Sequence, residues 1–428
     1  MGKRKVSEAG SKRAASFKDE LVKQARGGSQ GSVLFGRREI EAEAHAVNRV
    51  SSLCLPLDKA MGGNYIGGAF YGGFPAGRIT EVIGETSEGK SIIALQALAG
   101  TILAGGVAIY QETEHAWDHN WIDRLLKSYG IKKGIDELII LEPETIEEVM
   151  FNTDHWSNKA REVDPNKLVC VAWDSIAATM AKNEVDKDER HNYGPGQIGS
   201  QARALSVGLR KLQHNIKGTN TVFVMINQVR ANIGVRFGEK TSTPGGRAPG
   251  FYASVLIQLT GEGKLYRNAA EKTEGKMSRV HAPIGVSVCA YLKKNKTAPP
   301  FRKAFFPIYW EGANLGVWDH RSWFGYLKDR KIIQNVTKQS LKLTDMSGAE
   351  YQFVGETGFL KLLKNPEVEQ HIRNLVVMHD FKDASDGSGT VDEGIKIEDD
   401  DEVPVKAKKA KRLEPEDEEI QMPSFDED

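Results

Sequence analysis

Short apolar runs alternate with helical patterns through the middle of the chain. The runs are rich in valine, isoleucine and leucine and lie at 79–83, 107–110, 138–141, 168–173 and 221–226. Between them, apolar residues recur at helical spacing over 121–129, 146–161 and 198–216. Near-continuous apolar strands separated by helices are typical of parallel strands buried on both faces. The pattern therefore predicts an α/β fold with a mostly parallel, twisted sheet and helices on both faces.

The pattern changes toward the C-terminus. Apolar segments at 252–259, 285–292 and 302–309 have no helices between them, which predicts an antiparallel extension of the sheet. Helical periodicity returns at 321–328, 356–363 and 366–377 around a short strand-like segment. We therefore expect a basic N-terminal arm (1–50), an α/β core (51–315), a small α+β C-terminal domain (316–379) and a disordered acidic tail (380–428).

Charge is distributed unevenly along the 428 residues, although the formal net charge is zero. Residues 379–428 hold 18 Asp and Glu against 7 Lys and Arg, so the rest of the chain is basic. A basic body with an acidic tail suggests a polyanion partner for which the tail competes, although a tail that only aids solubility explains the charge equally well. The three cysteines are isolated, and no apolar run approaches the ~18 residues of a membrane span. A cytosolic protein with reduced thiols is expected.

The segment GETSEGKS (84–91) follows an apolar strand and precedes an apolar helix. It fits the pattern G-x-x-x-x-G-K-[ST] in the context that a phosphate-binding loop requires. Backbone N–H groups of such a loop and the helix N-terminus surround phosphates, the lysine reaches the β- and γ-phosphates, and the hydroxyl binds Mg²⁺. The loop is therefore expected to bind a nucleoside triphosphate through Gly84, Glu85, Thr86, Ser87, Glu88, Gly89, Lys90 and Ser91.

Polar residues follow three other predicted strands. Asp174 closes the run 168–173 and is expected to hold Mg²⁺, although an Asp there could also cap a helix. Glu114 and Glu112 lie at the end of the strand 107–110, and either could orient the water that attacks the nucleotide. Gln228 ends the strand 221–226, where its amide could sense the γ-phosphate or simply bond to a loop.

A long segment after Gln228 suits the sugar-phosphate chain of a nucleic acid. Residues 229–250 combine glycines and small hydroxyl residues with Arg230, Arg236, Lys240 and Arg247, and Ile233 is placed to contact bases. On the preceding helix, Arg203, Arg210 and Lys217 repeat every seven residues and share a face with Ser206. Such a stripe is commonly a solvated face, but next to the glycine-rich segment it predicts a second wall for a polyanion.

These motifs together resemble the bacterial RecA recombinases and their phage counterparts, from about Ser16 to Val377. The segment ETEHAWD (112–118) is similar to the one that contains the family's catalytic glutamate, which assigns that role to Glu114. Trp121 matches the aromatic residue placed against adenine, and Asp118 is assigned to the same nucleotide. Residues 226–254 resemble the family's second DNA-binding loop without a gap, with Gln228 as sensor, and 196–212 resemble the end of the first loop and its helix. The resemblance implies DNA contacts for Ile198, Arg203, Ser206, Arg210, Ile233, Gly245 and Gly246.

The segment KKNKTAPPF (293–301) resembles the family's Lys-x-Lys element. This implies that Lys294 and Lys296 reach the triphosphate of a neighbouring subunit, with Phe251 in the same interface. Residues 182–193 differ from the family's first DNA loop in length and sequence, and the basic run 406–412 in a long tail has no counterpart.

The resemblance implies a DNA-dependent ATPase that uses ATP and Mg²⁺, polymerises on single-stranded DNA, and catalyses pairing and strand exchange with homologous duplex DNA. The implied partners are DNA, further copies of the chain, and single-strand-binding and loader proteins, in the cytoplasm of a bacterial or phage-infected cell and without a membrane. Two alternatives remain, a hexameric helicase of the same fold and a nucleotide-gated scaffold that binds DNA without hydrolysis.

Overall fold

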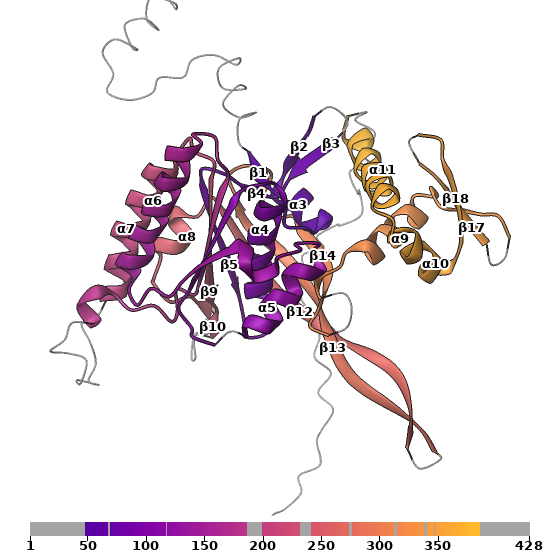
Figure 1. Cartoon of the computed structure of the whole chain (residues 1–428), viewed down its shortest axis with the longest axis horizontal. Coiled ribbons are helices and arrows are strands. Elements are labelled where there is room, and N and C mark those ends of the chain that lie inside the picture. The colour runs from indigo at the N-terminus through magenta and orange to yellow at the C-terminus, as the bar shows by residue number, and fades with distance from the viewer. Residues whose placement is uncertain are drawn as a thin grey trace, which may run out of the picture. The chain divides into compact units, whose positions relative to one another are not determined.

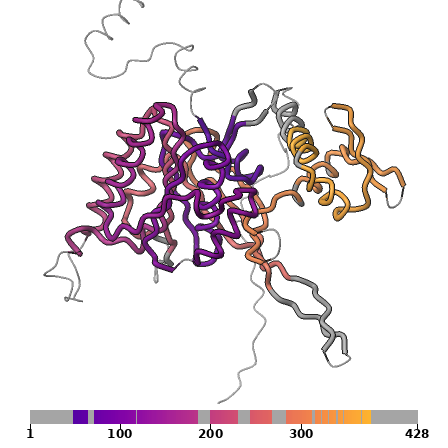
Figure 2. Tube along the Cα trace, viewed as in Figure 1, coloured from indigo at the N-terminus to yellow at the C-terminus, as the bar shows by residue number. Residues whose placement is uncertain are grey.

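The computed structural model describes residues 48–385 except 67–68, 117, 186–198, 232–240, 274–275, 312–314, 338–339 and 346 (Figures 1 and 2). Most of the expected N-terminal arm and acidic tail, and also Ile198, Ile233, Arg236 and Lys240, lie outside the described residues. Within the described part, no helix combines the length and the apolar character that a membrane span requires.

A nine-stranded mixed sheet forms the centre of the core. Its strands, in spatial order, are β15 (Gly316–Val317), β14 (Lys303–Tyr309), β13 (Lys276–Asn295), β12 (Val255–Thr273), β5 (Arg78–Gly84), β9 (Thr221–Gln228), β8 (Val169–Asp174), β6 (Val107–Glu112) and β7 (Leu138–Leu141). The neighbours from β12 to β7 pair in parallel, whereas β13, β14 and β15 add antiparallel strands. This arrangement confirms the predicted α/β fold and its extension. The assignment of 252–259 to the antiparallel part alone is wrong, because β12 also pairs in parallel with β5.

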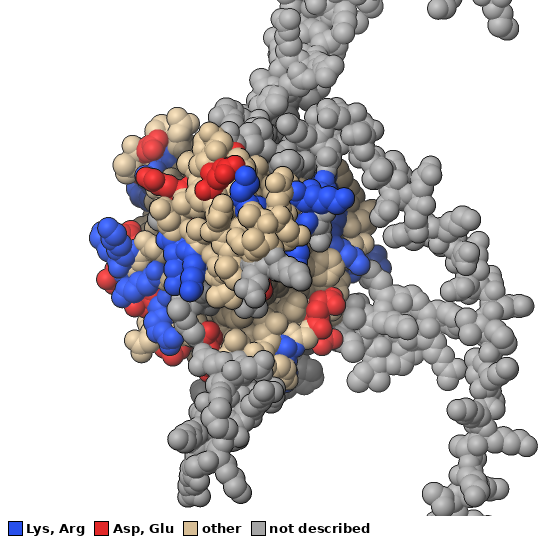
Figure 3. All heavy atoms as spheres, turned by 90° about the vertical axis from the view of Figure 1, so that its right-hand side faces the viewer, with Lys and Arg blue, Asp and Glu red and all other residues tan. Residues whose placement is uncertain are grey.

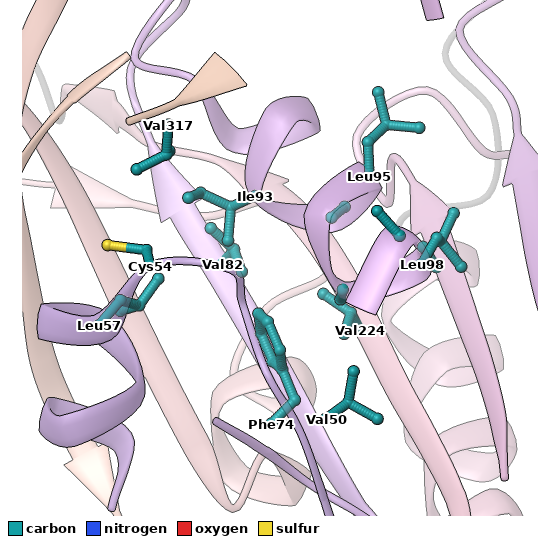
Figure 4. Close-up of a cluster of buried hydrophobic side chains, with 14 of the residues drawn as sticks. Val50, Cys54, Leu57, Phe74, Val82, Ile93, Leu95, Leu98, Val224 and Val317 are labelled. Carbon is teal, nitrogen blue, oxygen red and sulfur yellow. The ribbon is translucent and has the colours of Figure 1, made fainter. Parts of the chain in front are cut away.

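Helices cover both faces of the sheet, and two apolar clusters lie beneath them. One face carries α3 (Leu55–Met61), α4 (Lys90–Leu103) and α5 (His119–Ser128), and the other carries α6 (Ile146–Val163) and α7 (Ser200–Ile216), which Figure 1 shows side by side. Successive side chains of a strand point to opposite faces. Accordingly, Val82 and Val224 pack with Ile93 and Leu98 of α4 in the first cluster (Figure 4), whereas Phe223 belongs to the second.

Strands β12 and β13 continue beyond the sheet as a two-stranded ribbon (Figure 1). Their antiparallel register runs without a change of partner from Val255 opposite Asn295 to Thr273 opposite Lys276, with three bulges on the way. The sequence pattern predicted only the parts within the sheet. The outer part of the ribbon, residues 264–283, lacks regular apolar alternation in the sequence, so it carries no strong strand signal. Two smaller antiparallel pairs join β1 (Arg49–Val50) to β4 (Phe74–Pro75), and β2 (Gly63–Ile66) to β3 (Ala69–Gly72).

The predicted C-terminal helices are confirmed as α9 (His320–Asp329), α10 (Gly355–Leu362) and α11 (Pro366–Ser385), with a three-stranded sheet of β16 (Gln334–Asn335), β17 (Ser340–Thr344) and β18 (Glu350–Val354). Buried Asp319 accepts hydrogen bonds from the backbone N–H of Leu55, at 2.7 Å, and from the indole of Trp323, at 2.9 Å. The guanidinium of Arg373 lies 3.9 Å from the buried carboxylate of Asp58. Residues up to Met378 belong to one compact unit, and those from His379 onward form a second.

Candidate active site and nucleic-acid interface

Four parallel strands end at the same edge of the sheet with the predicted site residues. Gly84 at the end of β5 pairs with Gln228 of β9, and Glu112 at the end of β6 pairs with Asp174 of β8. The backbone N–H of Val229 donates to the carbonyl of Gly84 at 3.1 Å. The carboxyl ends of strands in an open α/β sheet are the usual place for a ligand.

The phosphate-loop segment connects β5 to α4, as the sequence predicted. Gly89 precedes the helix with φ +87°, and a Cβ there would lie 2.3 Å from the Cδ1 of Ile308, so glycine is required for both conformation and space. The buried amine of Lys90 donates to the carbonyl of Glu85 at 2.5 Å. Burial lowers the pKa of Lys90, against the charges of four nearby carboxylates, Glu88, Asp174, Glu114 and Glu85. This amine is therefore held in a partly desolvated site where an anionic ligand would be attracted strongly.

Asp174 lies beside the start of α4. Its carboxylate accepts hydrogen bonds from the hydroxyls of Ser91 and, at 3.0 Å, of Tyr110. Burial raises the pKa of Asp174 to about 6, the Ser91 hydrogen bond lowers it, and the charge of Glu114 adds to the increase. A buried carboxylate next to a hydroxyl offers the hard oxygen ligands that Mg²⁺ prefers, so Ser91 and Asp174 fit the metal expected from the sequence.

The structure separates the roles of the two glutamates after β6. Glu112 is buried, and its carboxylate accepts the backbone N–H groups of Glu114 at 2.9 Å and His115 at 3.0 Å, so it stabilises the turn. Glu114 is exposed, and its Oε1 accepts a 2.5 Å hydrogen bond from the hydroxyl of Ser175. The charge of Glu114 also acts on Lys90 and Asp174. Glu114 is thus the carboxylate that faces the phosphate loop.

The two residues assigned to the nucleotide base lie at the start of α5. Asp118 is the N-cap, because its Oδ1 accepts the N–H groups of Asn120 at 2.8 Å and of Trp121 at 3.4 Å. Trp121 is half-buried and packs against the first apolar cluster. Capping gives Asp118 a structural role that the sequence did not indicate.

The predicted nucleic-acid residues come together on α7. Arg203 and Arg210 are exposed on this helix, Lys217 is exposed at its C-cap, and Ser206 is half-buried. The turn from Pro244 to Arg247 packs on the same helix. At Gly245, with φ +83°, a Cβ would lie 2.3 Å from the Cδ1 of buried Leu205, and at Gly246 it would lie 3.6 Å from the Cβ of Ala202.

The segment after Gln228 has more structure than a loop. Arg230–Ala231 (β10) pairs with Thr241–Ser242 (β11), and Ala248–Tyr252 form α8, so a short hairpin leads back to the turn on α7. Arg247 is exposed at this turn. Figure 3 shows the side of the molecule that lies at the right of Figure 1, away from α7, and there Lys and Arg side chains gather in groups with acidic residues between them.

Lys294 and Lys296 are not brought to the phosphate loop of their own chain. Lys294 lies opposite Leu256, which lies opposite Glu81, three residues before Gly84. Its amine donates to the carbonyls of Gly250 at 2.7 Å and of Phe251 at 2.9 Å. Lys296 is exposed, and the Phe251 side chain is 70% exposed.

Several residues of the site were not expected from the sequence. Tyr110 binds Asp174, and Ser175 binds Glu114. Glu88 accepts the N–H groups of Glu85 at 2.7 Å and of Gly261 at 2.9 Å. Strand alternation alone could have indicated Tyr110, because it lies two residues before Glu112, whereas the contacts of Glu88 and Ser175 depend on tertiary structure.

Comparison with known proteins identifies the family to which the chain is similar. The family model of the RecA N-terminal domain matches residues 23–314. Protein RecA of Streptococcus sanguinis (strain SK36) is 35% identical over 273 residues, which cover 64% of this chain and 63% of that protein. Protein RecA of Leptospira meyeri is 35% identical over 286 residues, 67% of this chain and 64% of that protein. Protein RecA of Streptococcus agalactiae serotype III (strain NEM316) is 34% identical over 304 residues, 71% of each.

The chain thus spans slightly less than two thirds of the length of the first two of these relatives. The domain model nevertheless covers well over half of the chain, including every strand from β5 to β14. The sheet order and the phosphate loop agree with this match. The chain belongs to the RecA family.

Proposed function

We propose that this protein is an ATP-dependent homologous recombinase, which forms a helical filament on single-stranded DNA and catalyses pairing and strand exchange. One observation carries the proposal. The edge that gathers Lys90, Asp174, Glu114 and Gln228 is continuous with a hairpin that returns to the basic helix α7. A nucleotide at this edge would therefore be connected to a polyanion on α7 through the paired strands β10 and β11.

The nucleotide would bind at the N-terminus of α4. Backbone N–H groups of the loop and the amine of Lys90 would hold the phosphates. Ser91 and Asp174 would hold Mg²⁺, which offsets the charge that develops on the phosphates when it is bound. Glu114, oriented by the hydroxyl of Ser175, would accept a proton from the attacking water.

The binding of ATP would control the affinity of the protein for DNA through Gln228. This residue pairs with Gly84 at the start of the phosphate loop and lies two residues before β10. A γ-phosphate that attracts the Gln228 amide would bias the hairpin toward one arrangement, and hydrolysis would release it. The hairpin turn and the stripe of Arg203, Ser206 and Arg210 would then form two walls around the sugar-phosphate chain.

The second set of phosphate ligands would come from another protomer. Lys294 lies away from its own phosphate loop and donates to the backbone carbonyl of Phe251, whose ring is exposed, and Lys296 lies two residues further along the chain. In a filament, these lysines would complete the nucleotide site of the neighbour, so that ATP lies at each interface. The N-terminal arm 1–50 is proposed to support this assembly, 51–315 to form the ATPase core, and 316–379 a small accessory domain. Single-strand-binding and loader proteins are proposed as further partners in the cytoplasm.

The test combines an ATPase assay, with and without single-stranded DNA, and electron microscopy with a slowly hydrolysed ATP analogue. Stimulated hydrolysis and helical filaments are expected, and joint molecules should form when homologous duplex DNA is added. Closed rings would instead indicate a helicase. DNA binding without any hydrolysis would indicate a nucleotide-gated scaffold.

A further inference from the structure

One buried carboxylate near the site has no part in the mechanism above. Glu81 lies in the middle of β5 and is 1% exposed. Its Oε1 accepts a 3.0 Å hydrogen bond from the side-chain amide of Asn227, which is itself fully buried. A Cβ placed on Gly250 would lie 3.7 Å from the other oxygen, so the carboxylate also faces the backbone at the end of the hairpin segment.

Asn227 connects this carboxylate to the residues that respond to nucleotide and DNA. Its amide also donates to the carbonyl of Pro244 at 3.1 Å, at the turn that packs on α7. Its carbonyl oxygen accepts the backbone N–H of Gln228 at 3.0 Å. One side chain therefore joins β5, the end of β9 and the end of the hairpin segment, and its orientation depends on its bond to Glu81.

Lys294 reaches the same place from the other side. Glu81, Leu256 and Lys294 are in register across three adjacent strands. The amine of Lys294 donates to the carbonyls of Gly250 and Phe251, and its charge acts on Glu81. In this arrangement Lys294 is bound within its own protomer, so it must leave Gly250 and Phe251 to reach a neighbour's nucleotide.

The balance of charges at Glu81 depends on that movement. Burial raises the pKa of Glu81 to about 7, while the hydrogen bond from Asn227 and the charges of Lys294 and Lys293 lower it. Among the described residues, β13 supplies these two lysines, β9 supplies the neutral Asn227, and the segment at Gly250 supplies only backbone. Departure of Lys294 would leave a buried carboxylate with less opposing charge, and protonation of that carboxylate becomes favourable.

We propose that Glu81 is a positioning residue, which holds Asn227 and Lys294 in the resting arrangement and takes up a proton when Lys294 moves to the nucleotide of a neighbouring protomer. The proposal rests on the proposed function, because it needs Lys294 to act in trans. Since the proton is bound on assembly, a lower pH favours assembly. The carboxylate does not touch the nucleotide, so saturating ATP should restore the full rate.

The test measures proton uptake and kinetics on the full chain with single-stranded DNA. In weakly buffered solution with a pH indicator, the wild type should take up protons when a slowly hydrolysed ATP analogue is added near pH 7, and Glu81→Gln should not. The apparent KM for ATP should rise with pH in the wild type, while kcat changes little. The rise should reach up to about tenfold for each unit by which the pKa of Glu81 differs between the resting arrangement and the arrangement in which Lys294 has moved. In Glu81→Gln the KM should be nearly independent of pH. Glu262→Gln, an exposed glutamate on the neighbouring strand β12, is the matched control and should behave as the wild type.

The outcomes separate the two proposals. A wild type that hydrolyses no ATP or binds no DNA contradicts the proposed function. If it hydrolyses ATP but takes up no protons, or if Glu81→Gln keeps the wild-type dependence of KM on pH, the role of Glu81 is wrong. If a thermal melt shows that Glu81→Gln does not fold, the same measurements on Glu81→Asp test the proposal instead. Its shorter carboxyl should still titrate but with a displaced pH midpoint, and an unchanged midpoint overturns the proposal.

Discussion

The hydroxyl of Ser175 donates a 2.5 Å hydrogen bond to Oε1 of Glu114 and so joins the ends of two neighbouring strands at the candidate site. The carboxylate is exposed, and this bond restricts the directions in which its lone pairs point. A general base works efficiently only when it is held within reach of the proton that it removes. Substitutions of Glu114 and Ser175 are therefore the most direct test of the proposed ATP hydrolysis.

Removal of the Glu114 carboxylate should stop hydrolysis and leave binding intact. Glu114→Gln is expected to lower kcat by about 10²–10⁴-fold, the usual contribution of a general base, with unchanged ATP and DNA binding. Ser175→Ala should lower kcat by about 10–150-fold, since one hydrogen bond to a charged group contributes roughly 1.5–3 kcal/mol. Single-turnover ATPase measurements check both. Ser157→Ala, which removes a buried hydroxyl that has no hydrogen bond among the described residues, is the control and should hydrolyse ATP normally. Persistent ATPase in Glu114→Gln would move the role to another group.

Asp174 should oppose stability at neutral pH when no cation is present. Its pKa in the folded chain is about 6, above the ordinary 3.8, so its contribution is favourable below pH 3.8 and is lost as the pH rises through about 6. At pH 8, Asp174→Asn is therefore expected to raise the free energy of unfolding by roughly 1–3 kcal/mol. Mg²⁺ with an ATP analogue should raise the Tm of the wild type but not of the variant. Thermal melts at about pH 5 and pH 8 test this, and a variant less stable than the wild type at pH 8 would contradict it.

The basic stripe of α7 should contribute to DNA affinity through phosphate contacts. Arg203→Ala and Arg210→Ala are each expected to weaken binding to single-stranded DNA and to reduce the slope of log K against log salt concentration by about 0.7. Lys211→Ala is the matched control, because Lys211 is exposed on the same helix but about 100° around the axis from Arg210. Fluorescence anisotropy over a range of salt concentrations gives these slopes. Equal losses of DNA affinity in all three variants would mean that the total charge of the helix, and not specific phosphate contacts, determines binding.

The turn on α7 should tolerate no side chain at Gly245. An alanine there would place its Cβ 2.3 Å from Leu205 and adopt φ +83°, so the turn should leave the helix and DNA affinity should fall at least about tenfold. Gly218→Ala is the control, because Gly218 has φ +73° but no atom near the added Cβ. It should lower stability by roughly 1 kcal/mol without a change in DNA binding. ATP binding should persist in both variants, and loss of DNA binding in both would assign the effect to strain alone.

The parts of the fold that repeat a buried pattern could be predicted from the sequence. The strand Val169–Asp174 is apolar up to its last residue because both of its faces are covered, and the ends of such strands located Asp174 and Gln228. The outer part of the β12–β13 ribbon could not be predicted, because residues 264–283 lack the apolar alternation by which a strand is recognised. The distinction between Glu112 and Glu114 came from the resemblance and not from spacing, and the structure shows a physical basis for it in the N–H groups that Glu112 accepts. The role of Glu81 was missed because an acidic residue within an apolar strand does not reveal its partners, which are Asn227 on the adjacent strand and Lys294 two strands away.

Asp319 has a practical consequence for the design of shortened chains. It accepts the N–H of Leu55 at the first position of α3, and Arg373 approaches Asp58 on the same helix. A truncation after β14 would delete both groups, leave the buried N–H of Leu55 without its acceptor, and remove the cation next to buried Asp58, which would keep its hydrogen bonds from Ser51 and Ser52. A minimal soluble fragment for crystallography should therefore end after Met378, although every residue assigned to ATP or DNA lies before Tyr309.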